Sequence, residues 1–590
     1  MPFPNILSRV MSWRNRRAVA TSTAAVLGAA LSWGMAQQGP PSAGQGPGGG
    51  RGGPPPEPVS IPTALFAAPD PVRSCESLRL VALPDTTIDA AAVEPGDERT
   101  PPSCRVTATV THPPAGDRIK VFIGLPLKGW NGRFQGIGGG GFSGGSANGL
   151  RSPLAAGYAA GATDTGHEGG SGSFALDANG RLNWHAVRDN AYLGIHEMTV
   201  TGKALTEEFY GKAPRYAYFN GCSTGGRQGL SEAQRYPEDY HGILSGAPAI
   251  NWPKLHVEQL WGPLVMLEAK NFVPQCKLDA ATAAAVEACD TIDGVNDSVL
   301  EDPRRCTYDP KALVAWRPRG RGLLGTSPKA CDTITEADAA VIGRIWEGPK
   351  RKDGSFLWYG LPRGAGFALS ATGGTPLTAR PLGITLDWFR YFLTQNPQWD
   401  WTTLTHASYE QLWDQSVEQF GAVFGTDNPN LSAFRDRGGK LVLWHGWADP
   451  LIYAEGTIDY YTRVQQQMGG PQKEPAAATP RKEPAARATP SKEPAARATP
   501  STTSAFVRLF MAPGVGHCGG GTGPAPRNPF DSLVAWVEQG DAPETLGAVR
   551  RDEGGKIVRS RPLCQYPLVA RYKGRGSTDD ASSFECKASF

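Results

Sequence analysis

The stretch Tyr216-Ala-Tyr-Phe-Asn-Gly-Cys-Ser-Thr-Gly-Gly-Arg227 decides the fold. It consists of a short apolar strand, a glycine-rich turn with the pattern G-x-S-x-G around Ser223, and the start of a helix. Such a sharp turn exposes the serine hydroxyl, its glycines avoid steric clashes, and the helix N-terminus favours negative charge. The pattern predicts a nucleophile elbow with Ser223 as nucleophile. The alternative is a simple glycine-rich turn.

The segments around this turn have the order of an α/β sheet. Two of them, 189–210 and 227–236, have helical character. Short apolar runs typical of buried parallel strands occupy 119–125, 216–219, 440–444 and 506–511. Strands that alternate with helices in this way predict an α/β-hydrolase fold.

A serine nucleophile needs a base to take its proton and an acid to orient that base. In this fold class the acid and the base follow the serine in chain order. Asp449 follows the predicted strand 440–444, and the glycine-flanked His517 follows the strand 506–511. We therefore predict Asp449 as the acid and His517 as the base.

Other residues compete for both roles. His445 lies too close to Asp449 on the same strand end to be its natural partner, so we interpret it as lining the pocket. The remaining candidates are His167, His185 and His241 for the base, and Asp427 and Asp459 for the acid. Neither of these two aspartates directly follows so clear a strand.

Two cysteines adjoin the predicted catalytic residues. Cys222 precedes Ser223, and Cys518 follows His517. A disulfide between them would clamp the two loops together and stabilise the fold by about 5 kcal/mol through chain entropy. Its effect on position matters more, because a base misplaced by about 1 Å costs roughly a hundredfold in rate. The alternative is that each cysteine pairs elsewhere.

Negative charge on the carbonyl oxygen of the transition state needs backbone N–H donors. One predicted donor is the N–H of Thr224, the residue after the nucleophile. The second is expected from the glycine run 136–142, where we favour Gly140 over Gly139. This run lacks the Lys and Ser/Thr of a phosphate-binding P-loop.

The length of 590 residues leaves room for two hydrophobic cores. The net charge of +3 shows no concentrated basic face, which argues against a nucleic-acid partner. We predict catalytic segments at 59–250 and 431–590, separated by a Trp-rich lid at 251–430. Low-complexity Pro-rich segments at 37–58 and 471–504 are expected to be a tether and a surface insertion.

Residues 1–36 resemble an export signal, with arginines before a short apolar run and Ala36 at the expected cleavage point. A single membrane anchor is the alternative, but the run is short for a bilayer. Ten cysteines follow this segment, and an even number in an exported chain favours disulfides. The prediction is a secreted or periplasmic protein that has no membrane contact after cleavage.

The predicted lid contains a loop rich in carboxylates. Asp290, Asp293 and Asp297 surround Gly294, and hard oxygen ligands at such spacing suit calcium. The loop is not an EF-hand, because it lacks a glutamate at the twelfth position. The alternative is a solvated acidic turn.

The segments Gly221–Arg227, Asp449 and His517-Cys518 together resemble the tannase and feruloyl esterase family, which also includes mono(2-hydroxyethyl) terephthalate hydrolase. The resemblance spans about 60–570. It implies the Cys222–Cys518 disulfide and a structural calcium ion. The implied ligands are Asp290, Asp293 and Asp297 with the carbonyls of Val295 and Val299. The other implied disulfides are Cys75–Cys104, Cys289–Cys306, Cys564–Cys586 and, from the cysteines that remain, Cys276–Cys331.

The expected activity is hydrolysis of small esters of aromatic acids, as in feruloyl esterases and tannases, with the Trp-rich lid stacking on the aromatic ring. A mono(2-hydroxyethyl) terephthalate-type hydrolase is the nearest alternative. A serine peptidase and a non-catalytic phenolic-binding protein are the other two. Neither of these explains the paired Cys-Ser and His-Cys segments as well.

Overall fold

The computed structural model describes residues 63–65, 70–315, 333–368, 370–371, 379–469 and 503–589. The predicted export signal 1–36, the tether 37–58 and most of the insertion 471–504 lie outside these ranges. Among the described helices, none combines the length and apolar character required to cross a membrane.

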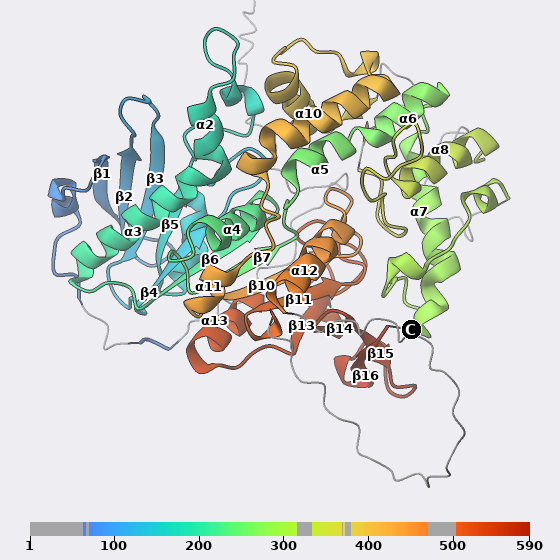
Figure 1. Ribbon diagram of the computed structural model, residues 1–590. Helices are drawn as coiled ribbons and strands as arrows, with labels where there is room; N and C mark the ends of the chain where they lie inside the picture. The colour runs from blue at the N-terminus through green and yellow to red at the C-terminus, as the bar shows by residue number, and fades with distance from the viewer. Residues whose placement is uncertain are drawn as a thin grey trace, which may run out of the picture. The chain divides into compact units, whose positions relative to one another are not determined.

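A nine-stranded sheet forms the centre of the described chain (Figure 1). Its strands, in spatial order, are β1 (Thr86–Glu94), β2 (Ser103–Val110), β3 (Ile119–Pro126), β5 (Ala159–Thr163), β4 (Arg133–Ile137), β6 (Tyr216–Cys222), β7 (Gly242–Gly246), β10 (Lys440–Gly446) and β11 (Val507–Ala512). The strands from β5 to β11 are parallel, so their carboxyl ends share one edge. This arrangement confirms the predicted α/β-hydrolase fold.

One predicted strand direction is wrong. The run 119–125 forms β3 as expected, but β3 pairs antiparallel with both β2 and β5. The run is apolar because both faces of β3 are covered, and a strand buried on both faces has the same composition in either direction.

Alternating side chains of the sheet pack against helices on its two faces. In β10, Leu441 and Leu443 belong to the cluster that includes α3 (Gly194–Tyr210), α4 (Thr224–Arg235) and α12 (Ala454–Met468). Val442 and Trp444 pack on the opposite face against α13 (Pro529–Gln539). This two-residue period is what a strand covered on both sides requires.

The segment between β7 and β10 is largely helical, and its buried side chains form one cluster with Phe142, Ala175, Val187 and Ala191 from the chain before β6. Its main helices are α5 (Trp252–Glu258), α6 (Trp261–Ala269), α7 (Gln275–Cys289), α8 (Glu336–Glu347), α9 (Gly383–Asp387), α10 (His406–Phe424) and α11 (Ser432–Asp436). Seven tryptophans are buried in this core: Trp252, Trp261, Trp346, Trp358, Trp388, Trp401 and Trp413. They therefore stabilise the helical region itself. The boundaries of the predicted lid at 251 and 430 stay predictions.

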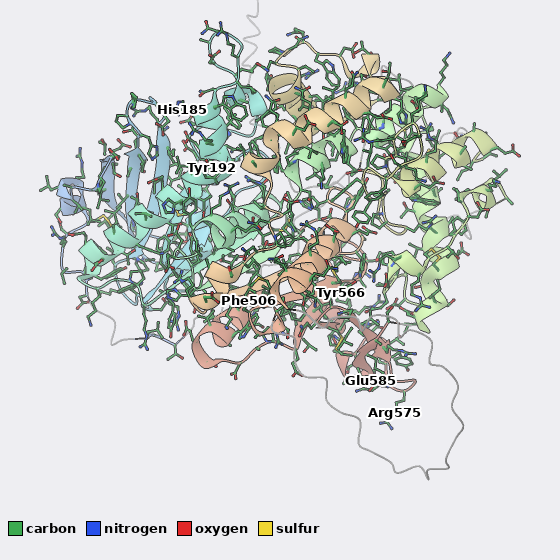
Figure 2. The ribbon with its side chains drawn as sticks, in the orientation of Figure 1. His185, Tyr192, Phe506, Tyr566, Arg575 and Glu585 are labelled. Carbon is green, nitrogen blue, oxygen red and sulfur yellow. A yellow bond between two sulfur atoms is a disulfide. The ribbon has the colours of Figure 1, made fainter. Side chains whose placement is uncertain are left out.

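The chain ends in short antiparallel strands, β13 (Thr545–Arg551), β14 (Ile557–Cys564), β15 (Leu568–Tyr572) and β16 (Phe584–Ala588). Figure 2 labels Tyr566 and Glu585 in this part. Four predicted disulfides are present: Cys75–Cys104, Cys222–Cys518, Cys289–Cys306 and Cys564–Cys586. Cys276 is also disulfide-bonded, and its predicted partner Cys331 lies outside the described residues.

Candidate active site

The backbone at Ser223 is strained. Ser223 joins β6 to α4 with φ 62° and ψ −122°, a conformation that costs a residue with a side chain about 1–3 kcal/mol. Its N–H donates to the Gly246 carbonyl at 3.0 Å. A Cβ at Gly221 would lie 2.4 Å from the Gly225 backbone, so the turn closes only with a glycine there. These are the features expected of a nucleophile elbow.

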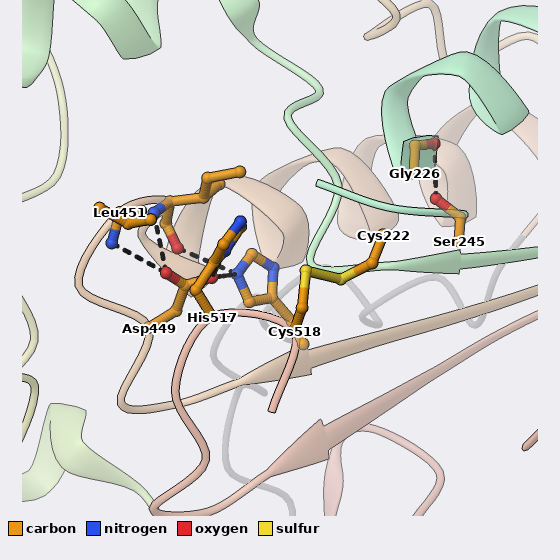
Figure 3. Close-up of a disulfide and its surroundings, with 9 residues drawn as sticks. Cys222, Gly226, Ser245, Asp449, Leu451, His517 and Cys518 are labelled. Carbon is orange, nitrogen blue, oxygen red and sulfur yellow. Dashed lines mark hydrogen bonds and ion pairs between the residues drawn. A yellow bond between two sulfur atoms is a disulfide. The ribbon is translucent and has the colours of Figure 1, made fainter. Parts of the chain in front are cut away.

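Asp449 lies between β10 and α12 and has no solvent exposure. Its Oδ1 accepts hydrogen bonds from the N–H groups of Leu451 at 2.8 Å and Ile452 at 3.0 Å. Its Oδ2 lies 2.8 Å from Nδ1 of His517 (Figure 3). Burial alone would raise the pKa of Asp449. The charge of His517 and the hydrogen bonds from His445 and His517 outweigh burial and hold this pKa well below its usual range.

His517 lies in the loop after β11. Since the Asp449 carboxylate can only accept, Nδ1 of His517 carries the hydrogen, and Nε2 of the neutral ring has its lone pair available. Nε2 makes no hydrogen bond to any described residue, and 15% of the side chain is exposed. This tautomer is the one that a general base requires.

The Cys222–Cys518 disulfide joins the Ser223 loop to the His517 loop (Figure 3). The two Cα atoms are 6.0 Å apart, although 296 positions separate them in sequence. Ser223 Oγ forms no hydrogen bond with a described residue. Serine–histidine hydrogen bonds are often long in proteins without substrate and shorten only when substrate binds.

The glycine run after β4 contacts the start of α4. The N–H of Gly139 donates to Gln228 Oε1 at 2.9 Å, and the N–H of Gly140 donates to the Ser143 carbonyl at 3.1 Å. The Thr224 hydroxyl donates to the Gly141 carbonyl at 2.6 Å. Gly140 could therefore stabilise an oxyanion only if its bond to Ser143 opened. The roles of Gly140 and Thr224 stay predictions.

The interpretation of His445 as pocket lining, too close in sequence to be a partner of Asp449, is wrong. His445 is completely buried beneath Asp449, with Nε2 3.1 Å from Asp449 Oδ2. The sequence placed it correctly at a strand end. It could not show that the loop after β10 folds back over the imidazole and covers it.

The other histidine candidates, His167, His185 and His241, make no hydrogen bond or ion pair with Asp449. His185 is exposed on α2 (Trp184–Arg188) and lies 3.1 Å from Arg188 (Figure 2). His241 precedes β7, at the edge opposite Ser223, and accepts the N–H of Ala217. Burial lowers the pKa of His167 to about 4, although hydrogen bonds with the backbone of Thr165 and Phe142 act in the opposite direction.

The rival acids are already paired with a surface arginine. Asp459 lies 3.0 Å and Asp427 3.6 Å from the Arg463 guanidinium. Among the acid candidates, only Asp449 contacts a candidate base.

Sequence reasoning missed Arg227 on α4. This side chain is fully buried and has no carboxylate partner among the described residues. Its guanidinium donates to the Ala191 carbonyl at 2.6 Å and lies 5.0 Å from the Trp252 ring and 5.4 Å from the Phe424 ring. Burial lowers its pKa to about 9. Arg227 thus ties α4, the helix that follows Ser223, to two helices of the helical region, a contact that no local pattern predicts.

The predicted calcium loop carries crowded oxygen atoms. A small cavity is lined by Asp293, Val295, Asp297, Val299 and Glu301, among others. Burial raises the pKa of Asp293 to about 6, and the charges of Asp297 and Asp290 add to this effect. Buried carboxylates with neighbouring carbonyls fit a hard cation such as calcium. Asp297 also pairs with Arg561 at 2.6 Å, so protein groups already neutralise part of the charge.

A second acidic group lies at the far end of α4. Its members are His196, Glu232 and Asp239. His196 Nδ1 is 2.7 Å from Asp239 Oδ2, and the Lys203 ammonium donates to the Asp239 carbonyl. The Lys203 ammonium supplies positive charge to this cluster without a metal.

Comparison with known proteins decides the family. Residues 104–587 match the family described as tannase and feruloyl esterase. The chain belongs to this family. It is 39% identical over 519 residues to a probable feruloyl esterase of Arthroderma benhamiae, covering 86% of this chain and 87% of the relative. It is 30% identical over 577 residues to the mono(2-hydroxyethyl) terephthalate hydrolase of Piscinibacter sakaiensis, covering 85% and 87%.

A solved structure agrees with this assignment. The crystal structure of feruloyl esterase B from Aspergillus oryzae aligns with a TM-score of 0.70 and 26% identity, covering 87% of this chain and 99% of that chain. Membership of the tannase and feruloyl esterase family makes the protein a carboxylic ester hydrolase.

Removal of the Cys222–Cys518 disulfide should lower kcat/KM by more than the accompanying loss of thermal stability accounts for. We expect Cys222→Ala/Cys518→Ala to lower kcat/KM on an ester substrate about 100-fold, because His517 loses its fixed position. The control is Cys75→Ala/Cys104→Ala, which removes a disulfide far from Ser223 and should lower Tm with little change in kcat/KM. Equal rate losses in the two variants would contradict a positional role. Ester kinetics and thermal unfolding measure both effects.

Proposed function

We propose that the protein is an exported serine esterase that hydrolyses esters of aromatic, phenolic acids through Ser223, His517 and Asp449. The observation that carries the proposal is the 2.8 Å Asp449–His517 hydrogen bond, held beside Ser223 by the Cys222–Cys518 disulfide. The family assignment supports the same chemistry.

The reaction proceeds in two halves. Ser223 Oγ attacks the ester carbonyl while Nε2 of His517 takes the hydroxyl proton, and His517 then gives this proton to the departing alcohol. A water molecule, deprotonated by His517, then attacks the acyl-enzyme carbonyl. The bond to Ser223 Oγ breaks, the acid leaves, and His517 returns the proton to Ser223 Oγ. Asp449 keeps its charge throughout and stabilises the protonated ring. The Thr224 N–H, at the start of α4, would donate to the carbonyl oxygen.

The names of the relatives support aromatic acyl groups. They include feruloyl esterases and a mono(2-hydroxyethyl) terephthalate hydrolase, whose acids all carry a benzene ring. The 39% identity to the probable feruloyl esterase favours a feruloyl-type substrate over a terephthaloyl one. The buried tryptophans fill the helical core, so they give no support to the predicted stacking on substrate.

The proposal includes a structural calcium ion and export. Asp290, Asp293 and Asp297, with the Val295 and Val299 carbonyls, would hold the ion, and the charge of the ion would neutralise these carboxylates. The ion would take no part in the chemistry. The basic, apolar segment 1–36 and the disulfides support an oxidising compartment.

Substitution of Ser223 tests the nucleophile. We expect the wild type to hydrolyse methyl ferulate, methyl gallate or mono(2-hydroxyethyl) terephthalate, and Ser223→Ala to lower kcat at least about 1,000-fold, because the acyl-enzyme cannot form. Ser152→Ala, an exposed serine on α1 (Arg151–Ala155), is the control and should match the wild type. Faster cleavage of peptide amides than of esters would favour a peptidase. Tight binding of phenolics without turnover would favour a binding protein.

Removal of calcium tests the proposed ion site. We expect EDTA to lower Tm by about 5 °C or more and added calcium to restore it, because an ion that binds only the native state stabilises it. Asp293→Asn should abolish this dependence, whereas Asp541→Asn, at an exposed carboxylate, should keep it. A wild-type Tm that does not change with EDTA would contradict the calcium site and support a solvated acidic turn. Differential scanning calorimetry measures the shift.

A further inference from the structure

Asp449 receives a second imidazole that the proposed mechanism does not use. His445, near the end of β10, is fully buried, and its Nε2 lies 3.1 Å from Asp449 Oδ2 and 2.9 Å from the Ile452 carbonyl. Its Nδ1 lies 2.8 Å from Oγ1 of Thr457, a buried residue on α12. Both ring nitrogens of His445 therefore have partners.

These partners fix the ring of His445. A carbonyl oxygen only accepts, so Nε2 carries a hydrogen and shares it between Ile452 and Asp449. When the ring is neutral, Nδ1 accepts a hydrogen bond from the Thr457 hydroxyl. Thr457 thus holds the tautomer from one side while Ile452 holds the ring from the other.

Asp449 is consequently saturated with donors. Oδ1 takes two backbone N–H groups, and Oδ2 takes one imidazole from His445 and one from His517. A buried carboxylate needs such donors to stay ionised. The two on Oδ1 hold that oxygen against the loop. His445 is the donor that holds Oδ2, the oxygen that His517 uses.

We propose that His445 is a positioning residue of the esterase, which holds Asp449 Oδ2 in line with Nδ1 of His517. This inference rests on the proposed Ser223–His517–Asp449 mechanism. His445 touches neither substrate nor Ser223, and it acts only through Asp449. Both imidazoles contact the same oxygen of Asp449, and the complete burial of His445 separates it from solvent.

The test compares variants at His445 that keep or lose the donor. We expect His445→Leu to lower kcat about 10- to 100-fold with KM nearly unchanged, because a hydrogen bond to an ionised group is lost. His445→Gln retains an N–H donor near the Nε2 position and should restore kcat to within about fivefold of the wild type. The acid limb of the kcat/KM profile should move to higher pH in His445→Leu, because Asp449 with one donor fewer holds protonated His517 more tightly.

A second pair of variants keeps the inference testable if His445→Leu does not fold. Thr457→Val is nearly isosteric and should lower kcat about fivefold, whereas Thr457→Ser should match the wild type. His241→Leu, at the opposite edge of the sheet, is the control for loss of an internal imidazole and should leave kcat unchanged. Wild-type kcat in folded His445→Leu, or no rescue by His445→Gln, overturns the inference. If His445→Leu does not fold, equal kcat in Thr457→Val and Thr457→Ser overturns it.

The rate at which diisopropyl fluorophosphate labels Ser223 separates this inference from the proposed substrate. Labelling needs the base and its orientation but no particular acyl group. A wild type that is labelled but hydrolyses no aromatic ester contradicts the substrate, and slower labelling of His445→Leu still supports the positioning role. A wild type that is neither labelled nor active overturns the catalytic assignment and this inference with it.

Discussion

The disulfide between Cys222 and Cys518 is the constraint on which the active site depends. Ser223 follows β6 and His517 follows β11, and β7 and β10 lie between these strands. Three strand spacings correspond to about 14 Å, too far for a serine and a histidine to meet. The loop after β11 must therefore cross back over the end of β10. The 6.0 Å distance between the two cysteine Cα atoms shows that the disulfide closes this gap.

The crossing loop also explains where the acid lies. It passes over β10, and the N–H of Ala448 donates to the Val515 carbonyl at 2.9 Å, so the loops of Asp449 and His517 pair along their backbones. Asp449 is thereby sealed from water, and a sealed carboxylate requires donors on both oxygens. Backbone N–H groups and two imidazoles supply them. The burial of Asp449 thus accounts for the contact that its Oδ2 makes with His445.

The features that depend on a local sequence pattern could be predicted from the sequence. The strained turn at Ser223, the strand ends that carry Asp449 and His517, and four disulfides all follow from spacing or from resemblance. The sequence did not predict features set by contacts between distant segments. The apolar run of β3 indicated burial but not its antiparallel direction, and His445 gave no sign that a loop would cover it. In the sequence, Arg227 has no feature that distinguishes it from an exposed helix residue. Only the folded structure shows its contacts with Trp252 and Phe424.

Arg227 shows how the helical region bears on the nucleophile. Its guanidinium is buried between α4, Trp252 of α5 and Phe424 of α10, and it donates to a carbonyl of the π-helix Asp189–Leu193. A buried charge without a carboxylate persists only where dipoles and ring faces solvate it, so these four segments must keep their mutual positions. Movement of α5 or α10 would expose the Arg227 guanidinium to solvent or remove the rings that contact it. The helical region therefore supports α4, the helix that begins after Ser223, through contacts with Arg227.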